Sequence, residues 1–301
     1  MSKVLITGAD SFTGRYLAAA LHQAGHEVHG LVRAPITGGV AGVHTLHVAD
    51  LADAAGLAAV VRDVQPHQVA HLAAISFVAH GDVAAIYATN VVGTRNLLEA
   101  LATSNAPLQS VLLASSANVY GNSVGGMLNE ATPPAPANDY AVSKLAMEYV
   151  ARLYAGRLPI VVTRPFNYTG VGQAESFLIP KIISHVRRRA PLIELGNLDV
   201  ARDFSDVRTV VQLYQRLLGT PAAVGQTFNV CAGKAWTLNE VLAMVRTISG
   251  HDFEVRVNPA FVRANEVQTL LGSRDKLDAA VGAVPQIELQ DTLRWMLEQP
   301  A

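Results

Sequence analysis

The chain has 301 residues, of which 50% are hydrophobic and 16% are charged, so it can bury a large core and disorder is not expected. Its 23 basic and 24 acidic side chains leave a formal net charge of −1, which excludes a whole-chain field that would gather nucleic acid or an anionic membrane. The single cysteine, Cys231, cannot form an internal disulfide. Apolar runs are too short for a signal peptide or a bilayer span. We therefore expect a soluble, cytoplasmic protein.

Short runs rich in Val, Ile and Leu predict strands, and the Ala-rich segments between them predict helices. Strands are expected at 4–9, 27–33, 43–50, 69–74, 110–116 and 160–167, and helices at 13–24, 53–64, 82–104 and 139–155. Helices that alternate with strands are typical of a parallel sheet covered on both faces. The fold class predicted is α/β, a doubly wound parallel sheet of Rossmann type.

A second, smaller α/β lobe is expected after about residue 165, where Gly and Pro become more frequent and the alternation stops. Short strands are predicted at 192–197 and 253–259. Segments 206–218 and 227–232 still have the patterns of a helix and a buried strand, so the chain is expected to return to the first sheet. The expected division is interleaved: residues 1–165 with about 203–232 form the first domain, and 166–202 with 233–301 form a substrate-binding lobe.

The first strand runs directly into a turn that contains Gly8 and Gly14 and opens a helix. Bare backbone in such a turn can approach a pyrophosphate, and its free N–H groups can bind the phosphate oxygens. Ser11 replaces the middle glycine of the usual three, and Phe12 and Thr13 complete the turn. A plain connection between strand and helix is the alternative, but the position after the first strand favours dinucleotide binding.

The end of the second strand distinguishes the two nicotinamide cofactors. Residues 30–34 offer no carboxylate for an adenine ribose, whereas Arg33 could pair with a 2′-phosphate. This pattern favours NADP(H), the alternative for Arg33 being a solvated strand end. Asp50 and Leu51 could flank the adenine, although Asp50 could instead cap the next helix. Ala73 and Ala74, after the fourth strand, complete the predicted cofactor-binding set.

Tyr140 and Lys144 lie four residues apart in a helical pattern, so both side chains project from one face. Ser116 stands at the carboxyl end of a predicted buried strand, where open α/β sheets bind ligands. An ammonium and an oxidised nicotinamide nearby would favour the phenolate and make Tyr140 a general acid or base. Lys144 would also hold the nicotinamide ribose, and Ser116 would polarise a substrate carbonyl. Ser115 is interpreted as a buried serine bonded to backbone.

These motifs together resemble the extended short-chain dehydrogenase/reductase family over essentially the whole chain: Gly8-x-x-Ser11-x-x-Gly14, SSANVYG at 115–121 and Tyr140-x-x-x-Lys144. Within it, RPFN at 164–167, GVGQ at 170–173, SF at 176–177 and RDFSDV at 202–207 resemble GDP-4-keto-6-deoxy-D-mannose reductases, and EVHGLVR at 27–33 resembles NADP-dependent GDP-mannose 4,6-dehydratases. The resemblance implies NADP(H), a GDP-linked 4-keto-6-deoxy sugar, and a homodimer paired through two helices of the first domain.

The two residues that follow Ser116 distinguish reductases from the related dehydratases. Dehydratases of the family supply carboxylates there, because removal of water across C5 and C6 needs an acid and a base. This chain has Ala117 and Asn118, neither of which exchanges protons near neutral pH. We therefore expect elimination to be lost while hydride transfer at C4 remains.

The resemblance also implies substrate-binding residues. Asn167, Arg202, Arg263 and Glu266 match positions that contact the diphosphate, the nucleoside or its ribose in relatives; each could also belong to an ordinary surface ion pair. Ser76 and His80 are candidates for the sugar because they follow the fourth strand.

The sequence thus predicts an NADPH-dependent reductase of a GDP-4-keto-6-deoxyhexose, with a product of rhamnose or 6-deoxytalose type. A nucleotide-sugar 4-epimerase with retained nicotinamide cofactor and a non-enzymatic NADP-sensing protein remain open. No metal site is predicted, because the histidine pairs His22/His26 and His67/His71 each leave the helix or enter a strand.

Overall fold

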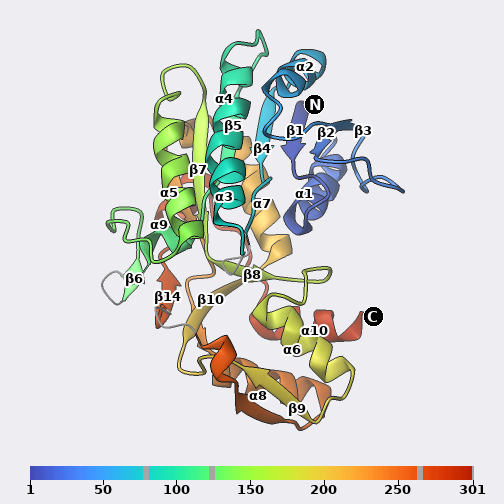
Figure 1. Ribbon diagram of the computed structural model, residues 1–301, viewed down its shortest axis with the longest axis vertical. Helices are drawn as coiled ribbons and strands as arrows, with labels where there is room; N and C mark the ends of the chain where they lie inside the picture. The colour runs from blue at the N-terminus through green and yellow to red at the C-terminus, as the bar shows by residue number, and fades with distance from the viewer. Residues whose placement is uncertain (77–80, 122–125, 263–266, 300–301) are drawn as a thin grey trace.

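The computed structural model describes residues 1–76, 81–121, 126–262 and 267–299. His80, Arg263 and Glu266, which were predicted to bind substrate, lie outside the described residues. Figure 1 shows a larger lobe that contains the N-terminus and a smaller lobe that contains helices α6, α8 and α10. In the part of the chain described, no helix is both long enough and apolar enough to cross a membrane.

The larger lobe is built on a seven-stranded parallel sheet in the order β11-β7-β5-β4-β1-β2-β3. Its strands are β1 Lys3–Thr7, β2 Glu27–Val32, β3 Thr45–Val48, β4 Gln68–His71, β5 Ser110–Ala114, β7 Ile160–Pro165 and β11 Thr227–Val230. The order runs outward in both directions from β1 and β4, which creates a crevice at their carboxyl ends. The predicted doubly wound α/β fold is confirmed.

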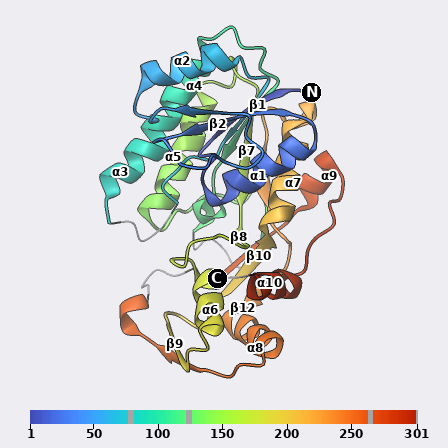
Figure 2. The ribbon, with the colours of Figure 1, turned by 90° about the vertical axis from the view of Figure 1, so that its right-hand side faces the viewer.

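Helices cover both faces of this sheet (Figure 2). On one face, α1 Phe12–Gln23 and α7 Val207–Leu218 pack together over one buried apolar cluster. On the other face, α2 Ala54–Val64, α4 Thr94–Ala102 and α5 Asp139–Arg152 pack over a second cluster. Because both faces are buried, the central strands are almost continuously apolar rather than alternating, as the sequence showed.

The single helix predicted over 82–104 is divided into three parts. The chain forms α3 Val83–Tyr87, then the wider π-turn η1 Ala88–Gly93, and then α4. Asn90 lies buried in the π-turn and its side chain binds the backbone of Ile75 in both directions, with Nδ2 donating to O (3.0 Å) and Oδ1 accepting from N (2.9 Å). Helical periodicity does not report such a turn, which is often found at functional sites.

The smaller lobe is formed mainly by the later part of the chain. One sheet holds β12 Ala235–Thr237, β10 Ala201–Asp206, β14 Thr269–Gly272 and β6 Met127–Leu128, with β8 Asn167–Thr169 paired to β10, and a second pairs β9 Leu192–Leu195 with β13 Glu254–Val257. Helices α6 Leu178–Arg187, α8 Leu238–Ser249 and α10 Leu289–Glu298 enclose a third apolar cluster.

The remaining elements are short. Helix α9 Asp275–Val281 packs on β11 of the large sheet, and 3₁₀ turns occupy Ala117–Tyr120, Pro221–Ala223 and Pro259–Phe261.

The predicted strand over 160–167 is wrong at its carboxyl end. Strand β7 stops at Pro165, and Asn167 begins β8, which pairs with β10 rather than with the large sheet. Pro165 has no N–H to donate to a strand ladder, and the N–H of Phe166 makes the last hydrogen bond to the large sheet, to the carbonyl of Val230 on β11 at 2.8 Å. The break carries Asn167 and Tyr168 from the end of the large sheet into the smaller lobe.

A buried histidine joins β1 and β4 to the helix after η1. His71 Nδ1 lies 2.7 Å from Thr7 Oγ1, and His71 Nε2 lies 2.8 Å from Thr94 Oγ1. Thr94 donates its own proton to the carbonyl of Asn90 (2.8 Å), so the imidazole donates from Nε2 and accepts at Nδ1. This arrangement suits the neutral ring, and burial lowers the pKa of His71 to about 3, with the Lys144 charge acting in the same direction.

The depressed pKa of His71 makes the stability of the fold depend on pH. Because the folded pKa lies below the unfolded value of about 6.5, His71 favours folding above that value and its contribution is lost as pH falls. At pH ~5.5 the loss is about 1 kcal/mol. We expect His71→Gln to have a lower melting temperature than the parent at pH 7 but a smaller decrease between pH 7 and pH 5.5. Thermal unfolding at both pH values checks this, and parallel decreases would contradict it.

Candidate active site at the carboxyl ends of the strands

The turn after β1 brings two glycines and the end of β4 into close contact. Gly8 has a φ of +67°, and a Cβ there would lie 2.9 Å from the Cα of Ala73. A Cβ on Gly14 would collide with the carbonyl oxygen of Gly8. Ser11 takes the middle position as the N-cap of α1, accepting a 3.1 Å hydrogen bond from the N–H of Gly14. The turn therefore has the close backbone approach and the helix N-terminus that bind a pyrophosphate.

The same turn contacts the smaller lobe through Tyr168, a residue that the sequence pattern did not single out. The ring of Phe12 stacks on that of Tyr168 at 6.1 Å between centroids, and Thr13 Oγ1 lies 2.8 Å from the Tyr168 hydroxyl. Burial raises the pKa of Tyr168, which keeps its phenol neutral. Tyr168 thus joins the predicted cofactor turn to β8. The sequence held one signal for Tyr168, because this residue directly follows Asn167, which was assigned to the substrate.

The residues predicted around the adenosine occupy the ends of β2 and β3. Arg33 follows β2 directly and is exposed. Asp50 does not cap α2, because Asp53 fills that position and Asp50 instead accepts from the N–H of Ala52 at 2.8 Å. Leu51 is buried. Ala74 lies in the loop after β4, next to Ala73.

Ser116, Tyr140 and Lys144 are brought together at the carboxyl end of β5. Their residues are only 4%, 7% and 4% exposed, respectively. Helix α5 begins just before Tyr140, with Asn138 as its N-cap, so the first turn presents the phenol and the next turn presents the ammonium. Lys144 Nζ donates to the carbonyl oxygen of Ala114 at 2.7 Å. The three predicted catalytic residues therefore lie together at the carboxyl end of β5.

Burial controls the protonation of this set. It raises the pKa of Tyr140 to about 12, against an opposing interaction with the Ser116 side chain, and the nearby Tyr168 raises the pKa further. Burial also lowers the pKa of Lys144 to about 8, while the carboxylate of Glu148 raises it. The phenol therefore holds its proton at neutral pH, as a proton donor must. The protein groups alone do not lower the pKa of Tyr140. The lowered pKa expected for this phenol would require the positive charge of an oxidised cofactor.

The side chain of Ser115 was expected to bond to backbone, but it has a different partner. Ser115 does not bond to backbone through its hydroxyl: Oγ donates to Glu148 Oε1 at 2.6 Å. Asn118 donates from Nδ2 to Ser116 Oγ at 3.1 Å, and Ala117 is buried. An amide and a methyl group thus stand at the two positions where a dehydratase was expected to have carboxylates.

The predicted substrate residues that the structure describes are distributed over the loop after β4 and the sheet of the smaller lobe. Asn167 lies on β8, opposite Phe204 of the paired β10, and Arg202 lies two residues before Phe204. Among the described residues, no partner reaches the buried Nδ2 of Asn167, so this donor is available to a ligand. Arg202 is half-buried and donates to the carbonyls of Ala201 and Gln268. Ser76 is exposed in the loop after β4.

The described segments contain no group of three or more His, Cys, Asp or Glu side chains arranged to hold a metal ion. The predicted catalytic residues offer a hydroxyl, a phenol and an ammonium.

The chain is similar to proteins that act on GDP-linked sugars. A family model described as GDP-mannose 4,6 dehydratase matches residues 5–296. GDP-6-deoxy-D-talose 4-dehydrogenase from Aggregatibacter actinomycetemcomitans is 32% identical over 93% of this chain and 91% of its own length. GDP-6-deoxy-D-mannose reductase from Pseudomonas aeruginosa is 33% identical over 98% of this chain and 96% of its own length.

Solved structures agree on the fold. A provisionally named epimerase from Burkholderia cenocepacia superposes with a TM-score of 0.92 and 52% identity, over 98% of this chain and 97% of that one. RMD from Pseudomonas aeruginosa, solved with NADPH, superposes with a TM-score of 0.85 and 30% identity, over 99% and 98% of the two chains. Together with the site geometry, these matches place the chain among the oxidoreductases: it belongs to the GDP-mannose 4,6-dehydratase family of extended short-chain dehydrogenases/reductases.

Proposed function

We propose that this protein reduces the C4 ketone of a GDP-linked 4-keto-6-deoxyhexose with NADPH. The observation that carries the proposal is the buried set of Ser116, Tyr140 and Lys144 next to the glycine turn, with no carboxylate at the two positions after Ser116. The names of the two GDP-sugar relatives, a reductase and a 4-dehydrogenase, support this class of substrate, and the name of the dehydrogenase supports reaction at C4.

The residues present fit a dinucleotide cofactor. We assign its pyrophosphate to the turn of Gly8, Ser11 and Gly14, and its nicotinamide ribose to Lys144. Phe12, Thr13, Asp50, Leu51, Ala73 and Ala74 complete the cofactor-binding set. The exposed Arg33 suits the 2′-phosphate of NADP(H), and the Pseudomonas aeruginosa neighbour was solved with NADPH. When bound, NADPH supplies the hydride that the protein itself cannot provide.

Tyr140 then supplies the proton. As negative charge develops on the C4 oxygen, the phenol donates its proton to that oxygen and Ser116 donates a hydrogen bond to it. Lys144 stabilises the phenolate left behind, and its hydrogen bond to Ala114 keeps the ammonium at a fixed place beside the strand end. Because Asn118 and Ala117 cannot exchange protons, the ketone is reduced without loss of water.

We place the nucleotide-sugar across β8 and β10, with Asn167 and Arg202 binding its polar groups; the unpartnered Nδ2 of Asn167 supports this placement. Arg263 and Glu266 are assigned to the nucleoside diphosphate, and Ser76 and His80 to the sugar. The product is a GDP-linked sugar of rhamnose or 6-deoxytalose type, according to the face of C4 that receives the hydride.

A 4-epimerase is the second candidate, favoured by the provisional name of the Burkholderia cenocepacia structure. An epimerase retains its oxidised cofactor and returns the hydride to the opposite face, so it needs no supply of NADPH. The two candidates therefore differ in stoichiometry: a reductase consumes one NADPH for each sugar, whereas an epimerase consumes none.

Turnover of NADPH with freshly generated GDP-4-keto-6-deoxymannose tests the proposal. The near-ultraviolet absorbance of NADPH is expected to fall in proportion to the ketone added. Tyr140→Phe removes the proton donor and should lower kcat by about 100-fold or more while leaving NADPH affinity within about threefold. An unchanged absorbance with the parent protein would exclude the reductase, and full activity of Tyr140→Phe would show that another group is the acid.

Substitution of Arg33 tests the choice of cofactor. Arg33→Ala removes the cation assigned to the 2′-phosphate, and loss of such a charge-assisted contact should raise the KM for NADPH by about tenfold or more. The KM for NADH, which has no 2′-phosphate, should change little. Steady-state kinetics with both cofactors gives the comparison. Equal changes for NADPH and NADH would show that Arg33 does not read the phosphate.

A homodimer is proposed through the outer face of α5. Val142 and Tyr149 of this helix and Leu153, the residue that caps its carboxyl end, are seven and four residues apart and are exposed, Leu153 by 75%. Val92 is exposed on the adjoining π-turn η1. Large apolar side chains gathered on one face are typical of an interface. Leu153→Glu should convert a dimer to a monomer while the variant keeps the secondary structure of the parent, and its melting temperature should no longer depend on protein concentration. Light scattering on both forms checks this; a monomeric parent, or a variant that stays dimeric, would contradict it.

A further inference from the structure

A second buried charged group lies one helical turn beyond Lys144. Glu148 is 3% exposed and Arg164 is 4% exposed, and the two form a bidentate ion pair: Nε to Oε1 at 2.9 Å and Nη2 to Oε2 at 2.7 Å. Removing two charges from water is costly, and such pairs are often no more stable than an apolar replacement. A role beyond stability is therefore worth seeking for this pair.

The pair connects the two elements that carry the catalytic set, α5 and the end of β5, to strand β7. Glu148 belongs to α5, as do Tyr140 and Lys144, and its Oε1 also accepts from Ser115, the residue before Ser116 at the end of β5. Arg164 is the residue before the proline that ends β7. One carboxylate thus fixes the helix of the general acid to the strand end of Ser116 and to the strand that continues into β8.

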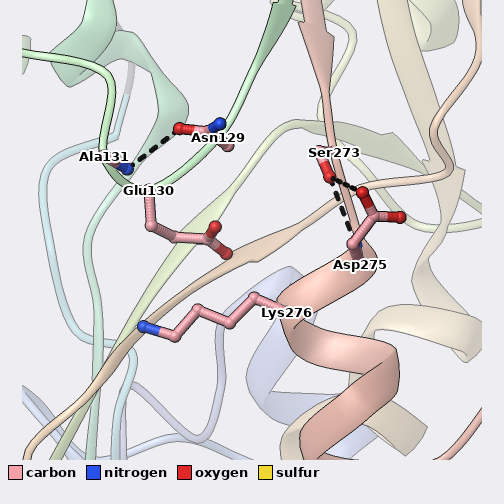
Figure 3. Close-up of a pocket in the computed structure, with 6 residues that line it drawn as sticks. All are labelled: Asn129, Glu130, Ala131, Ser273, Asp275 and Lys276. Atoms are coloured by element: carbon pink, nitrogen blue, oxygen red, sulfur yellow. Dashed lines mark hydrogen bonds between the residues drawn. The ribbon is translucent and has the colours of Figure 1, made fainter.

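Hydrogen bonds continue from the pair toward the smaller lobe. Arg164 Nη1 donates to the Tyr120 hydroxyl at 3.0 Å, and this hydroxyl donates to Asn229 Oδ1 at 2.7 Å. The N–H of Asn229 in turn donates to Glu130 at 2.7 Å. Glu130 and Lys276 both line a surface hollow of about 510 Å³, and Figure 3 shows Lys276 reaching it from a helix and Glu130 from a separate segment. The network therefore runs from Glu148, one helical turn after Lys144, through Asn229 of β11 to Glu130 at the hollow.

We propose that Glu148, held by Arg164 and Ser115, is a positioning residue of the reductase: its carboxylate fixes α5 against β5 and supplies the negative charge that keeps the Lys144 ammonium beside the cofactor. This role rests on the proposed function and extends it to residues that do not touch the substrate. Arg164 is the second positioning residue, because it determines how much of the carboxylate charge reaches Lys144.

The charges around Lys144 determine the expected direction of the effect. On its own helix are Tyr140, whose phenol stays neutral below a pKa of about 12, and Glu148, which favours the ammonium. From β4, His71 stays neutral above a pKa of about 3. From β7, Arg164 neutralises part of the Glu148 charge. Removing the carboxylate should therefore lower the pH at which Lys144 loses its proton, and removing the guanidinium should raise it.

Two single variants test the proposal because a purely structural role would not separate them. In Glu148→Gln, the alkaline limb of the kcat profile with NADPH should move to lower pH by about one unit, and in Arg164→Gln it should move upward. Both variants should also lose about tenfold or more in kcat, because the helix is held less firmly. The proposal would be overturned if the alkaline limb of the kcat profile stayed in place in both variants, or moved in the same direction in both.

A double variant and a matched control keep the test interpretable if the single variants fold poorly. Glu148→Gln with Arg164→Gln removes both charges and should restore the position of the alkaline limb but not the full kcat; full kcat in this variant would overturn the positioning role. Asp278→Asn breaks the half-buried Arg274–Asp278 pair of α9. It should lower the melting temperature without moving the limb, and a moved limb would show that the readout is not specific to the site.

Binding of NADPH gives a readout that does not depend on the sugar. Fluorescence titration against pH follows the Lys144 ammonium through its contact with the nicotinamide ribose. If the parent protein does not reduce the GDP-sugar, the proposed function fails, yet opposite pH shifts of NADPH affinity in the two single variants would still support the role of Glu148. Identical pH dependence in both variants would remove that role even if the parent is an active reductase.

Discussion

The hydrogen bond from the Lys144 ammonium to the last carbonyl of β5 is the contact around which the rest of the site is arranged. It holds a cation in a place where burial lowers its pKa to about 8, so the charge must be supported by what surrounds it. The last residue of β5, Ala114, supplies the carbonyl, and α5 supplies Glu148 one turn further along. Tyr140 lies one turn earlier on the same helix, so its phenol is on the same face of the helix as Lys144.

The connection between the two lobes depends on a few residues that lie next to one another in sequence. Pro165 ends β7, and within four residues the chain has placed Asn167 and Tyr168 on a strand of the smaller lobe. Tyr168 contacts the helix that follows the glycine turn, and the buried Nδ2 of Asn167 has no hydrogen-bond partner among the described residues. A ligand held between these side chains would therefore contact both lobes at once, as a cofactor and a sugar brought together for hydride transfer require.

The sequence predicted what depends on local pattern. Apolar periodicity and the glycine turn were sufficient for the doubly wound sheet, and spacing on one helix was sufficient to pair Tyr140 with Lys144. Features that depend on distant partners were missed or wrong. The π-turn at Asn90 depends on a backbone segment fifteen residues earlier, and the partner of Ser115 is a carboxylate thirty-three residues later. Glu148 carried a readable signal, because it repeats the four-residue step from Tyr140 to Lys144, but only the fold brings Arg164 to it.

The protonation of the site bears on the direction of the chemistry. An epimerase must first remove a hydride and a proton from an alcohol, for which a phenolate is the useful form, whereas a reductase begins with a ketone and needs a phenol. Burial favours the phenol, since it raises the pKa of Tyr140 to about 12 in the absence of a positive cofactor ring. The reduced nicotinamide carries no positive charge on its ring, so it leaves this preference intact, and the oxidised form reverses it. The buried phenol therefore suits a reaction that starts from the reduced cofactor and a ketone. The side chain of Asn118, which bonds to Ser116 Oγ, is an amide that exchanges no proton near neutral pH.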